Sequence, residues 1–427
     1  MNRKDLPISH FFGVLTTLVI FCLFLTGMAN SSPSSRPDRD YILIGHPNPT
    51  TGPLAGFGSA SPWTDDRIVN LINANGGIYI KEYGKKLPVK VKIVDTESDL
   101  STAVKVTTNL IVQDKVDLIV VSHTPDVVVP VAAVCEKYKV PCISSNCPVD
   151  PWLDNGPYEW SYHIFWTVDS LCDLYVGLWD EYADQTNKTV GCLWSDDPDA
   201  RTWRPIFEKK LTERGYTFVE FSGFPYMTRD FSSAIRQFKD KHVDILVGTL
   251  IFPDLATFWR QAKQMGFSPK MATIGKALLF PSDINNLGGN LAEGLVTEIW
   301  WGPSHPYTSA LTLETPKMIY DAWENETKTQ CTMAHGFVYA DYEVAFDVLK
   351  RAQSLDKETI RQTLAETDLD TVVGHVKYNE QHYSPSPLVA GQWTHGRNWP
   401  WELKIVYNKQ SSEILTTGQV TFPIPTK

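Results

Sequence analysis

The chain has 427 residues, of which 43% are hydrophobic and 21% charged, so it can form two or three domains with sizeable cores. Its formal net charge is −10 and it contains no basic run, which argues against nucleic acids and anionic membrane surfaces as partners. The 14 Trp and 17 Tyr residues are many for this length, and such large, rigid side chains can line a ligand cleft as readily as a core.

The N-terminus has the pattern of an export signal. Arg3 and Lys4 precede a charge-free apolar run, Phe11 to Thr26, and small residues follow up to Ala29. We expect a signal peptide over residues 1–29, a flexible Pro/Ser-rich leader over residues 30–40, and a soluble periplasmic or otherwise extracytoplasmic mature protein. The apolar run is slightly long, so an uncleaved membrane anchor remains the alternative.

Six cysteines follow the expected cleavage site, at positions 135, 142, 147, 172, 192 and 331. An oxidising compartment permits disulfides, and Cys135 and Cys142 flank one predicted helix-to-strand turn, so we expect these two to pair. The other cysteines are expected to be buried thiols. No CxxC motif and no His pair at i, i+4 occurs, so we expect no metal site and no cofactor.

Strands and helices alternate through the first part of the mature chain. Strands are expected at 41–45, 89–95, 118–121, 141–144 and 162–166, and helices at 62–74, 100–113 and 127–138. The loop from Pro47 to Ser61 after the first strand contains Gly52, Gly56 and Gly58 without the spacing of a dinucleotide-binding motif. Strands and helices at this spacing predict a parallel sheet.

The same alternation then begins again. Helices are expected at 168–182, 203–214, 231–241 and 255–265, and strands at 189–194, 217–221, 244–249, 270–274 and 296–300. Further helices are expected at 309–325, 336–354 and 357–366, and strands at 374–378 and 403–407. We therefore expect an α/β protein of two lobes with several crossings and a cleft between them: lobe 1 from residues 41–166 and 302–373, lobe 2 from 167–301 and 374–427.

No catalytic motif is evident. The chain lacks G-x-S-x-G, GxxxxGK[ST], HExxH and a strand-linked GxGxxG. Asp196, Asp197 and Asp199 could form an acid/base group, but they follow a strand and precede a helix, which favours a turn and helix N-cap. An extracytoplasmic hydrolase that uses these carboxylates remains the weaker alternative.

Several segments resemble the type I periplasmic solute-binding proteins, and more closely the leucine/isoleucine/valine-binding family of branched-chain amino acid ABC transporters. They are Pro49 to Gly58 after the first strand, Asn75-Gly76-Gly77-Ile78, Val91 to Asp95, Asp230-Phe231-Ser232, and Asp254 to Gly266. No single motif is specific, but their order and spacing extend over nearly the whole mature chain.

The resemblance implies a binding protein and not an enzyme. A small organic solute that is carboxylate-, aromatic-acid- or amino-acid-like would bind in the cleft, and the lobes would close by a hinge motion. The closed, monomeric protein would then dock on an inner-membrane ABC permease served by a separate ATPase. A ligand-sensing module for a signalling partner is the alternative, and a neighbouring histidine kinase gene instead of permease genes would favour it.

The resemblance also implies where the ligand binds. In such proteins the first lobe holds the ligand through loops like Ser122-His123-Thr124 and Ser145-Asn146, which follow predicted strands here. Hydroxyls and N–H groups at helix N-termini suit a carboxylate. Phe57, with Gly58 beside it, matches a position that often packs on the ligand, and Asp197 completes this set of candidates.

Lys276 is the departure from the family pattern. It follows the predicted strand at 270–274, where amino-acid binders of the family commonly place an acidic residue that meets the ligand's ammonium group. With no carboxylate evident in its own motif, Lys276 predicts a ligand with an anionic or carbonyl end. Trp300 and Trp301 end the second series, and strand alternation predicts that only one of them, Trp300, faces the cleft.

Overall fold

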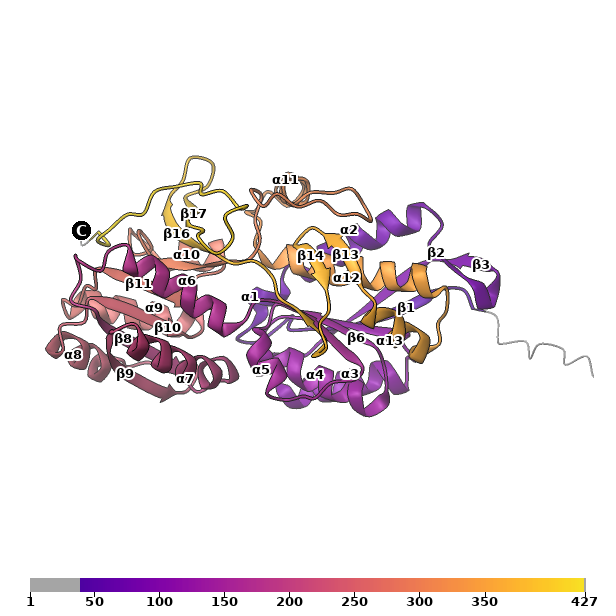
Figure 1. Ribbon diagram of the computed structural model, residues 1–427, viewed down its shortest axis with the longest axis horizontal. Coiled ribbons are helices and arrows are strands. Elements are labelled where there is room, and N and C mark those ends of the chain that lie inside the picture. The colour runs from indigo at the N-terminus through magenta and orange to yellow at the C-terminus, as the bar shows by residue number, and fades with distance from the viewer. Residues whose placement is uncertain (1–38, 426–427) are drawn as a thin grey trace, which may run out of the picture. The chain divides into compact units, whose positions relative to one another are not determined.

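Two sheets flanked by helices make up the part of the chain that the computed structural model describes, residues 39–425 (Figure 1). The expected signal peptide and the leader up to residue 38 lie outside the described residues. We call each sheet with its flanking helices a lobe. The expected α/β class with two lobes is confirmed.

The first lobe contains a six-stranded parallel sheet in the order β15-β7-β6-β5-β1-β4. Its strands are β1 (Ile42–Asn48), β4 (Val89–Asp95), β5 (Leu118–Ser122), β6 (Cys142–Ser145), β7 (Ser161–Ile164) and β15 (Tyr383–Ser384). Its helices are α1 (Ala55–Gly58), α2 (Ser61–Ala74), α3 (Leu100–Val112), α4 (Pro125–Tyr138) and α5 (Val149–Leu153). A hairpin of β2 (Ile78–Ile80) and β3 (Lys85–Leu87), with a 3₁₀ turn at Lys81–Tyr83 between them, was not predicted.

The second lobe contains a seven-stranded sheet in the order β17-β16-β12-β11-β10-β8-β9, in which β16 and β17 are antiparallel to their neighbours. Its strands are β8 (Thr189–Ser195), β9 (Thr217–Phe224), β10 (Ile245–Thr249), β11 (Met271–Gly275), β12 (Val296–Ile299), β16 (Val389–His395) and β17 (Trp401–Tyr407). Its helices are α6 (Val168–Asp180), α7 (Pro198–Glu213), α8 (Ser232–Asp240), α9 (Phe252–Gln264) and α10 (Pro281–Leu287). Sequence periodicity predicted the five parallel strands of this sheet and the antiparallel β17, whereas β16 was missed.

Three further helices follow the second series: α11 (Pro316–Thr327), α12 (Ala334–Ala352) and α13 (Lys357–Ala365). The first was predicted to begin at Ser309, but it begins at Pro316 because Thr315 caps it and accepts a hydrogen bond from the backbone N–H of Met318. Helix α12 is buried over most of its length and packs on α2, β5 and β6, so it forms part of the first lobe's core.

The chain passes between the lobes three times, at residues 165–167, 300–302 and 385–388. The last crossing lies later than expected. The hairpin of β13 (Asp368–Thr371) and β14 (Gly374–Lys377) leads into β15, which pairs with β7 of the first sheet. Residues 374–384 therefore lie with the first lobe. The two-residue strand Tyr383–Ser384 is too short to show a periodic pattern, so its pairing with β7 was not predicted.

All six described cysteines are buried, unbridged thiols, so the expected Cys135–Cys142 disulfide is absent from the described residues. Cys135, on α4, contacts Cys142, on β6, and this contact together with burial raises the pKa of the Cys142 thiol well above its ordinary value. They pack as small apolar groups in the core of the first lobe.

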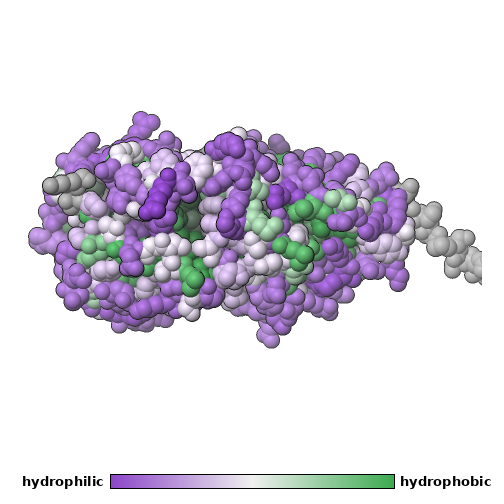
Figure 2. Space-filling view, turned by 90° about the horizontal axis from the view of Figure 1, so that it is seen from above, coloured by the Kyte–Doolittle hydropathy of each residue, from purple (hydrophilic) through white to green (hydrophobic). Residues whose placement is uncertain are grey.

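The surface of the molecule is mainly hydrophilic on the face shown in Figure 2, where apolar residues form separate smaller areas. Within residues 39–425 there is no helix with the length and apolar character needed to span a membrane. The same residues bring no three His, Cys, Asp or Glu side chains together in a way that could hold a metal ion.

Candidate functional site

A cavity lies between the two lobes, at the carboxyl ends of strands β5, β6, β10, β11 and β12. This edge is where open α/β sheets hold ligands. The cavity has a volume of about 30 Å³, room for a few water molecules at most. Its lining is formed by Phe57, Thr124, Pro125, Asn146, Pro148, Phe165, Trp166, Asp199, Trp203, Thr249, Lys276, Leu279, Glu298 and Trp300.

The first lobe contributes polar groups on strained backbone. Thr124 follows β5 with φ 61° and ψ 148°, and Asn146 follows β6 with φ 53°. A β-branched residue at positive φ is a genuine outlier, and such strain costs about 1–3 kcal/mol and gathers at binding sites. The side-chain oxygens Oγ1 of Thr124 and Oδ1 of Asn146 are buried without a hydrogen-bond partner among the described residues. They are therefore available to a ligand.

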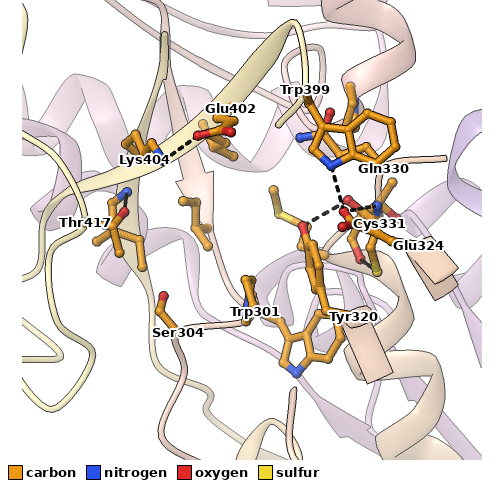
Figure 3. A pocket seen from close by; sticks show the side chains of 18 of the residues that line it. Trp301, Ser304, Tyr320, Glu324, Gln330, Cys331, Trp399, Glu402, Lys404 and Thr417 are labelled. Carbon is orange, nitrogen blue, oxygen red and sulfur yellow. Dashed lines mark hydrogen bonds and ion pairs between the residues drawn. The ribbon is translucent and has the colours of Figure 1, made fainter. Parts of the chain in front are cut away.

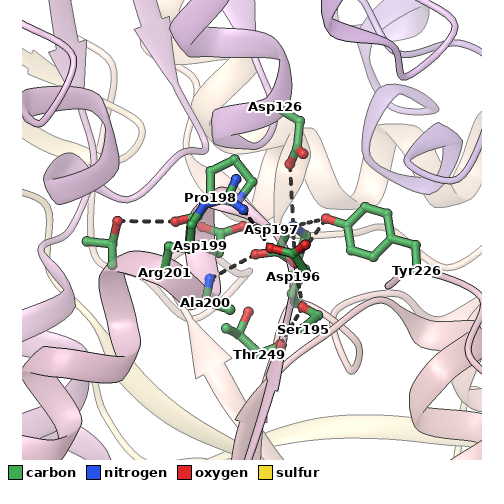
Figure 4. Close-up of polar contacts among 12 residues, drawn as sticks. Asp126, Ser195, Asp196, Asp197, Pro198, Asp199, Ala200, Arg201, Tyr226 and Thr249 are labelled. Atoms are coloured by element: carbon green, nitrogen blue, oxygen red, sulfur yellow. Dashed lines mark hydrogen bonds and ion pairs between the residues drawn. The ribbon is translucent and has the colours of Figure 1, made fainter. Parts of the chain in front are cut away.

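The second lobe contributes Lys276, which follows β11 at φ 66° and is only 6% exposed. Its ammonium Nζ lies 2.8 Å from Oδ2 of Asp199 and 3.4 Å from Oδ2 of Asp197. It also lies 3.5 Å from Oδ2 of Asp126, on α4 of the first lobe, and donates a hydrogen bond to the hydroxyl of Tyr226 at 2.9 Å. Figure 4 shows Asp126 pointing toward the Asp196–Asp199 segment.

This burial and pairing shift the pKa values of Lys276, Asp197 and Asp199. Although burial opposes its charge, the carboxylates of Asp197 and Asp199 raise the pKa of the Lys276 ammonium well above its ordinary value. Burial raises the pKa of Asp199 to about 7 even though Lys276 acts to lower it. For Asp197 the balance is reversed, because Lys276 and the hydroxyl of Ser195 outweigh burial and lower its pKa. The single ammonium group of Lys276 is thus the shared ion-pair partner of Asp126, Asp197 and Asp199.

The motif around Lys276 contains no carboxylate, but Asp197 and Asp199 reach the ammonium from another part of the chain. Asp197 and Asp199 lie far from it in sequence, and only the pairing of β8, β10 and β11 brings the segments together. Because the lysine is already neutralised, it does not by itself demand an anionic ligand. Asp197 also caps α7 by accepting a hydrogen bond from the backbone N–H of Ala200 at 2.8 Å, as the turn interpretation predicted.

Aromatic rings form most of the apolar lining. Trp300 faces the cavity, whereas its neighbour Trp301 lines a different pocket and donates a hydrogen bond from its indole N–H to the carbonyl of Val372. Trp166, Trp203 and Phe165 also line the cavity and were missed from the sequence. Two of these follow β7 at the first crossing, so their position at a strand end is the signal that could have identified them.

Several predicted site residues do not line the cavity. The hydroxyls of Ser122 and Ser145 donate to Oδ2 of Asp341, on α12, at 2.7 and 2.6 Å. The reason is that α12 packs over the ends of β5 and β6, which sequence spacing alone does not show. Nε2 of His123 contacts the hydroxyl of Ser61 at 3.1 Å, and burial lowers the pKa of this imidazole well below its ordinary value.

Gly58 and Phe57 differ in role although they are adjacent. A side chain at Gly58 would meet the backbone oxygen of Pro49 at 2.4 Å, so this glycine permits a close approach of two backbone segments. Phe57 lines the cavity and its ring lies 4.8 Å from that of Phe280, edge to face, across the two lobes. Together with Asp126 and Lys276, this contact joins the lobes in a closed arrangement.

A second, larger pocket of about 360 Å³ lies on the far side of the crossing at residues 300–302, between α11 and the β16–β17 hairpin (Figure 3). Its polar groups are already paired with one another: Glu324 accepts from the indole N–H of Trp399 at 3.1 Å, and Lys404 contacts Glu402 at 2.5 Å. The cleft cavity, with its unpartnered polar atoms, is therefore the better candidate for a binding site.

Comparison with known proteins identifies the family of this chain. A family model described as periplasmic binding protein matches residues 42–397. The Leu/Ile/Val-binding protein homolog 1 of Brucella suis is 22% identical over 360 residues, which covers 83% of this chain and 91% of the relative.

Two solved structures share the fold. A leucine-binding protein from Thermotoga maritima superimposes with a TM-score of 0.72 at 20% identity, covering 86% of this chain and 99% of the other. A branched-chain amino acid transporter substrate-binding protein from Streptococcus pneumoniae, in complex with isoleucine, gives 0.69 at 20% identity, covering 90% and 100%. The chain belongs to the periplasmic binding protein family, in the type I group that includes the leucine/isoleucine/valine-binding proteins.

Proposed function

We propose that this protein is the extracytoplasmic solute-binding subunit of an ABC importer, which captures an amino-acid-like solute between its lobes and delivers it to a membrane permease. The observation that carries the proposal is a cavity built from both lobes, with unpartnered polar atoms on each side. Thr124 and Asn146 supply them from the first lobe, and Asp199 and Thr249 from the second. A ligand that contacts the polar atoms of both lobes at once binds more tightly when the lobes are closed, so it favours the closed state.

The three crossings between the lobes support a hinge mechanism, since short connecting segments can absorb the backbone rotations of domain closure. The lobes are in contact through Phe57 and Phe280 and through Asp126 and Lys276. The cavity is smaller than an amino acid, so the lobes must separate to admit one. Ligand entry therefore requires a movement of one lobe relative to the other.

The charges around the cavity favour a ligand with an ammonium group. Three carboxylates, Asp126, Asp197 and Asp199, surround the single ammonium of Lys276. A further acid, Glu298, lines the cavity and is buried, which raises its pKa. A positive ligand group near Asp199 would complete the pairing, while a ligand carboxylate can meet Thr124 and the N-terminus of α4.

The hydrolase alternative finds no feature in its favour among the described residues. Asp197 caps α7 and Asp199 pairs with Lys276, while Asp196 lies on the surface in an ion pair with Arg201 at 2.7 Å. The three carboxylates therefore have structural partners, and the hydroxyl of Ser195 beside them donates a hydrogen bond to Oδ2 of Asp197 at 2.6 Å.

A thermal-shift screen of amino acids, carboxylates and amides tests the proposal. A ligand at 100 times its dissociation constant should stabilise the protein by about 2.7 kcal/mol. Asn146→Ala should reduce the shift, and Gln330→Ala, in the second pocket, is the matched control that should leave it unchanged. If no amino-acid-like compound raises the melting temperature, the proposed ligand class is wrong.

A further inference from the structure

Five aromatic residues line the cavity, and four of them surround it from the crossings and the second lobe. The ring centroid of Trp166 lies 5.9 Å from that of Trp203, with an angle of 70° between the ring planes. It lies 6.4 Å from the ring centroid of Trp300, with an angle of 41° between the planes. Phe165 lies 5.2 Å from Trp300 at 66°. The rings are inclined to one another and do not form a parallel stack. Ring faces and ring edges therefore both contribute to the lining of the cavity.

This aromatic wall adjoins uncompensated negative charge. Oδ2 of Asp199 pairs with Lys276, but Oδ1 is buried without a partner among the described residues. The one ammonium of Lys276 is shared with Asp126 and Asp197, so at least one negative charge in this group lacks a counter-charge. Burial raises the pKa of Asp199 to about 7, consistent with a carboxylate that needs a further cation.

An unsubstituted ammonium group would find few acceptors here. It has three N–H donors. The carboxylate of Glu298 already accepts from the hydroxyls of Tyr175 and Thr297 and from the backbone N–H of Lys276. Among the described residues, only Oδ1 of Asp199 and Oγ1 of Thr249 are unpartnered acceptors in the lining on this side of the cavity. A cation without N–H donors fits such a lining better.

We propose that the ligand is a betaine-type zwitterion, an N-methylated amino acid whose quaternary ammonium group contacts Trp166, Trp203 and Trp300 beside Asp199. The negative faces of tryptophan rings attract a cation and their apolar surface packs on its methyl groups. The ligand's carboxylate lies toward Thr124 and Asn146. This inference rests on the proposed function and specifies the solute class for the same cleft.

Isothermal titration of the full mature protein with three related carboxylates tests the inference. Glycine betaine carries the quaternary cation. 3,3-Dimethylbutanoate has the same shape but carbon in place of nitrogen, so it lacks the positive charge, and glycine keeps the positive charge but lacks the methyl groups. We expect glycine betaine to bind at least ten-fold more tightly than either of the others. Equal or weaker binding of glycine betaine, or no binding, overturns the inference.

Substitution of the tryptophans separates charge recognition from simple packing. Trp203→Leu should weaken glycine betaine binding at least ten-fold and 3,3-dimethylbutanoate binding less than three-fold, whereas Trp203→Phe should retain much of the preference. Trp300→Phe serves as a second variant if Trp203→Leu fails to fold. Trp399→Leu, in the second pocket, is the matched control and should change neither affinity. An equal loss for both probes in Trp203→Leu contradicts the cation contact.

The two proposals fail differently. If leucine or another unmethylated amino acid binds and glycine betaine does not, the inference on methylation is wrong and the solute-binding function stands. If neither the methylated probes nor any amino-acid-like compound of the thermal-shift library binds, both are wrong.

Discussion

Removal of the Lys276 charge is the most direct test of the charge arrangement in the cleft. Lys276→Met keeps the length of the side chain and deletes the ammonium that Asp126, Asp197 and Asp199 share. All but Asp126 are nearly inaccessible to solvent, with the lysine side chain 5% and that of Asp197 1% exposed. The carboxylates would then be buried without a counter-charge.

The expected loss depends on pH. When the carboxylates are ionised, removing one partner of a buried ion pair costs about 3–5 kcal/mol. Burial already gives folded Asp199 a pKa of about 7, above the ordinary 3.8, so the folded protein holds this proton more tightly than the unfolded chain and becomes less stable as pH rises through this range. Without the Lys276 ammonium, the free energy of unfolding must fall more steeply with rising pH, because the ionised carboxylates then have no counter-charge. We expect a loss of about 1 kcal/mol near pH 5, from the lost hydrogen bonds, and about 3 kcal/mol near pH 8.

Urea unfolding at several pH values measures this difference. Lys317→Met is the matched control, since Lys317 pairs with Asp321 on the surface of α11 and its side chain is 65% exposed. It should change the free energy of unfolding by less than about 0.5 kcal/mol at every pH. Adding Asp199→Asn to Lys276→Met removes one uncompensated charge and should recover part of the loss near pH 8. A Lys276→Met variant whose loss is the same at both pH values would refute the charge pairing described for the cleft.

Three other substitutions separate strain, packing and internal hydrogen bonding. Thr124→Gly should raise the free energy of unfolding by about 1–3 kcal/mol by relieving positive φ, and should weaken ligand binding several-fold; unchanged affinity would place Thr124 outside the site. Ser145→Ala removes a hydrogen bond to Asp341 and should lower the free energy of unfolding by about 1–3 kcal/mol in urea titrations, with ligand affinity within two-fold of the unsubstituted protein. Gly275→Ala would bring a methyl group within 2.4 Å of the ring of Trp203, so calorimetry should show at least a ten-fold loss of ligand affinity; an unaltered dissociation constant would mean that the ring can move aside without harm.

Sequence periodicity predicted the helices and strands whose buried residues form a regular apolar pattern within the element itself. The strand Val89–Asp95 was predicted with its observed bounds, and the helices near Leu100 and Lys357 within a residue or so, because an apolar run or an apolar face of a helix is visible in sequence. The short strands β2, β3, β13 and β15, and the longer β16 with its Gly391 and Gln392, carry less such pattern. Strands of this kind form because a partner strand is nearby, so their existence depends on tertiary contacts.

The candidate site divides in the same way. Strand-end positions and the family resemblance identified Phe57, Thr124, Asn146, Lys276 and Trp300, which do line one cavity. Which polar groups are free there could not be read from spacing, because Ser122 and Ser145 are turned to Asp341 by a helix that lies some 200 residues later in the chain.

The sequence by itself therefore determined the two-lobed α/β fold, the family and the edge of the sheets at which a ligand would lie. Only the tertiary structure decided the charge at that edge. The pairing of β8 with β10 and of β10 with β11 places Asp197 and Asp199 against Lys276, and the closed lobes add Asp126. Electrostatic balance depends on distances between groups far apart in sequence, and so the sign of the charge that the cleft can accept follows from the fold and not from the lysine alone.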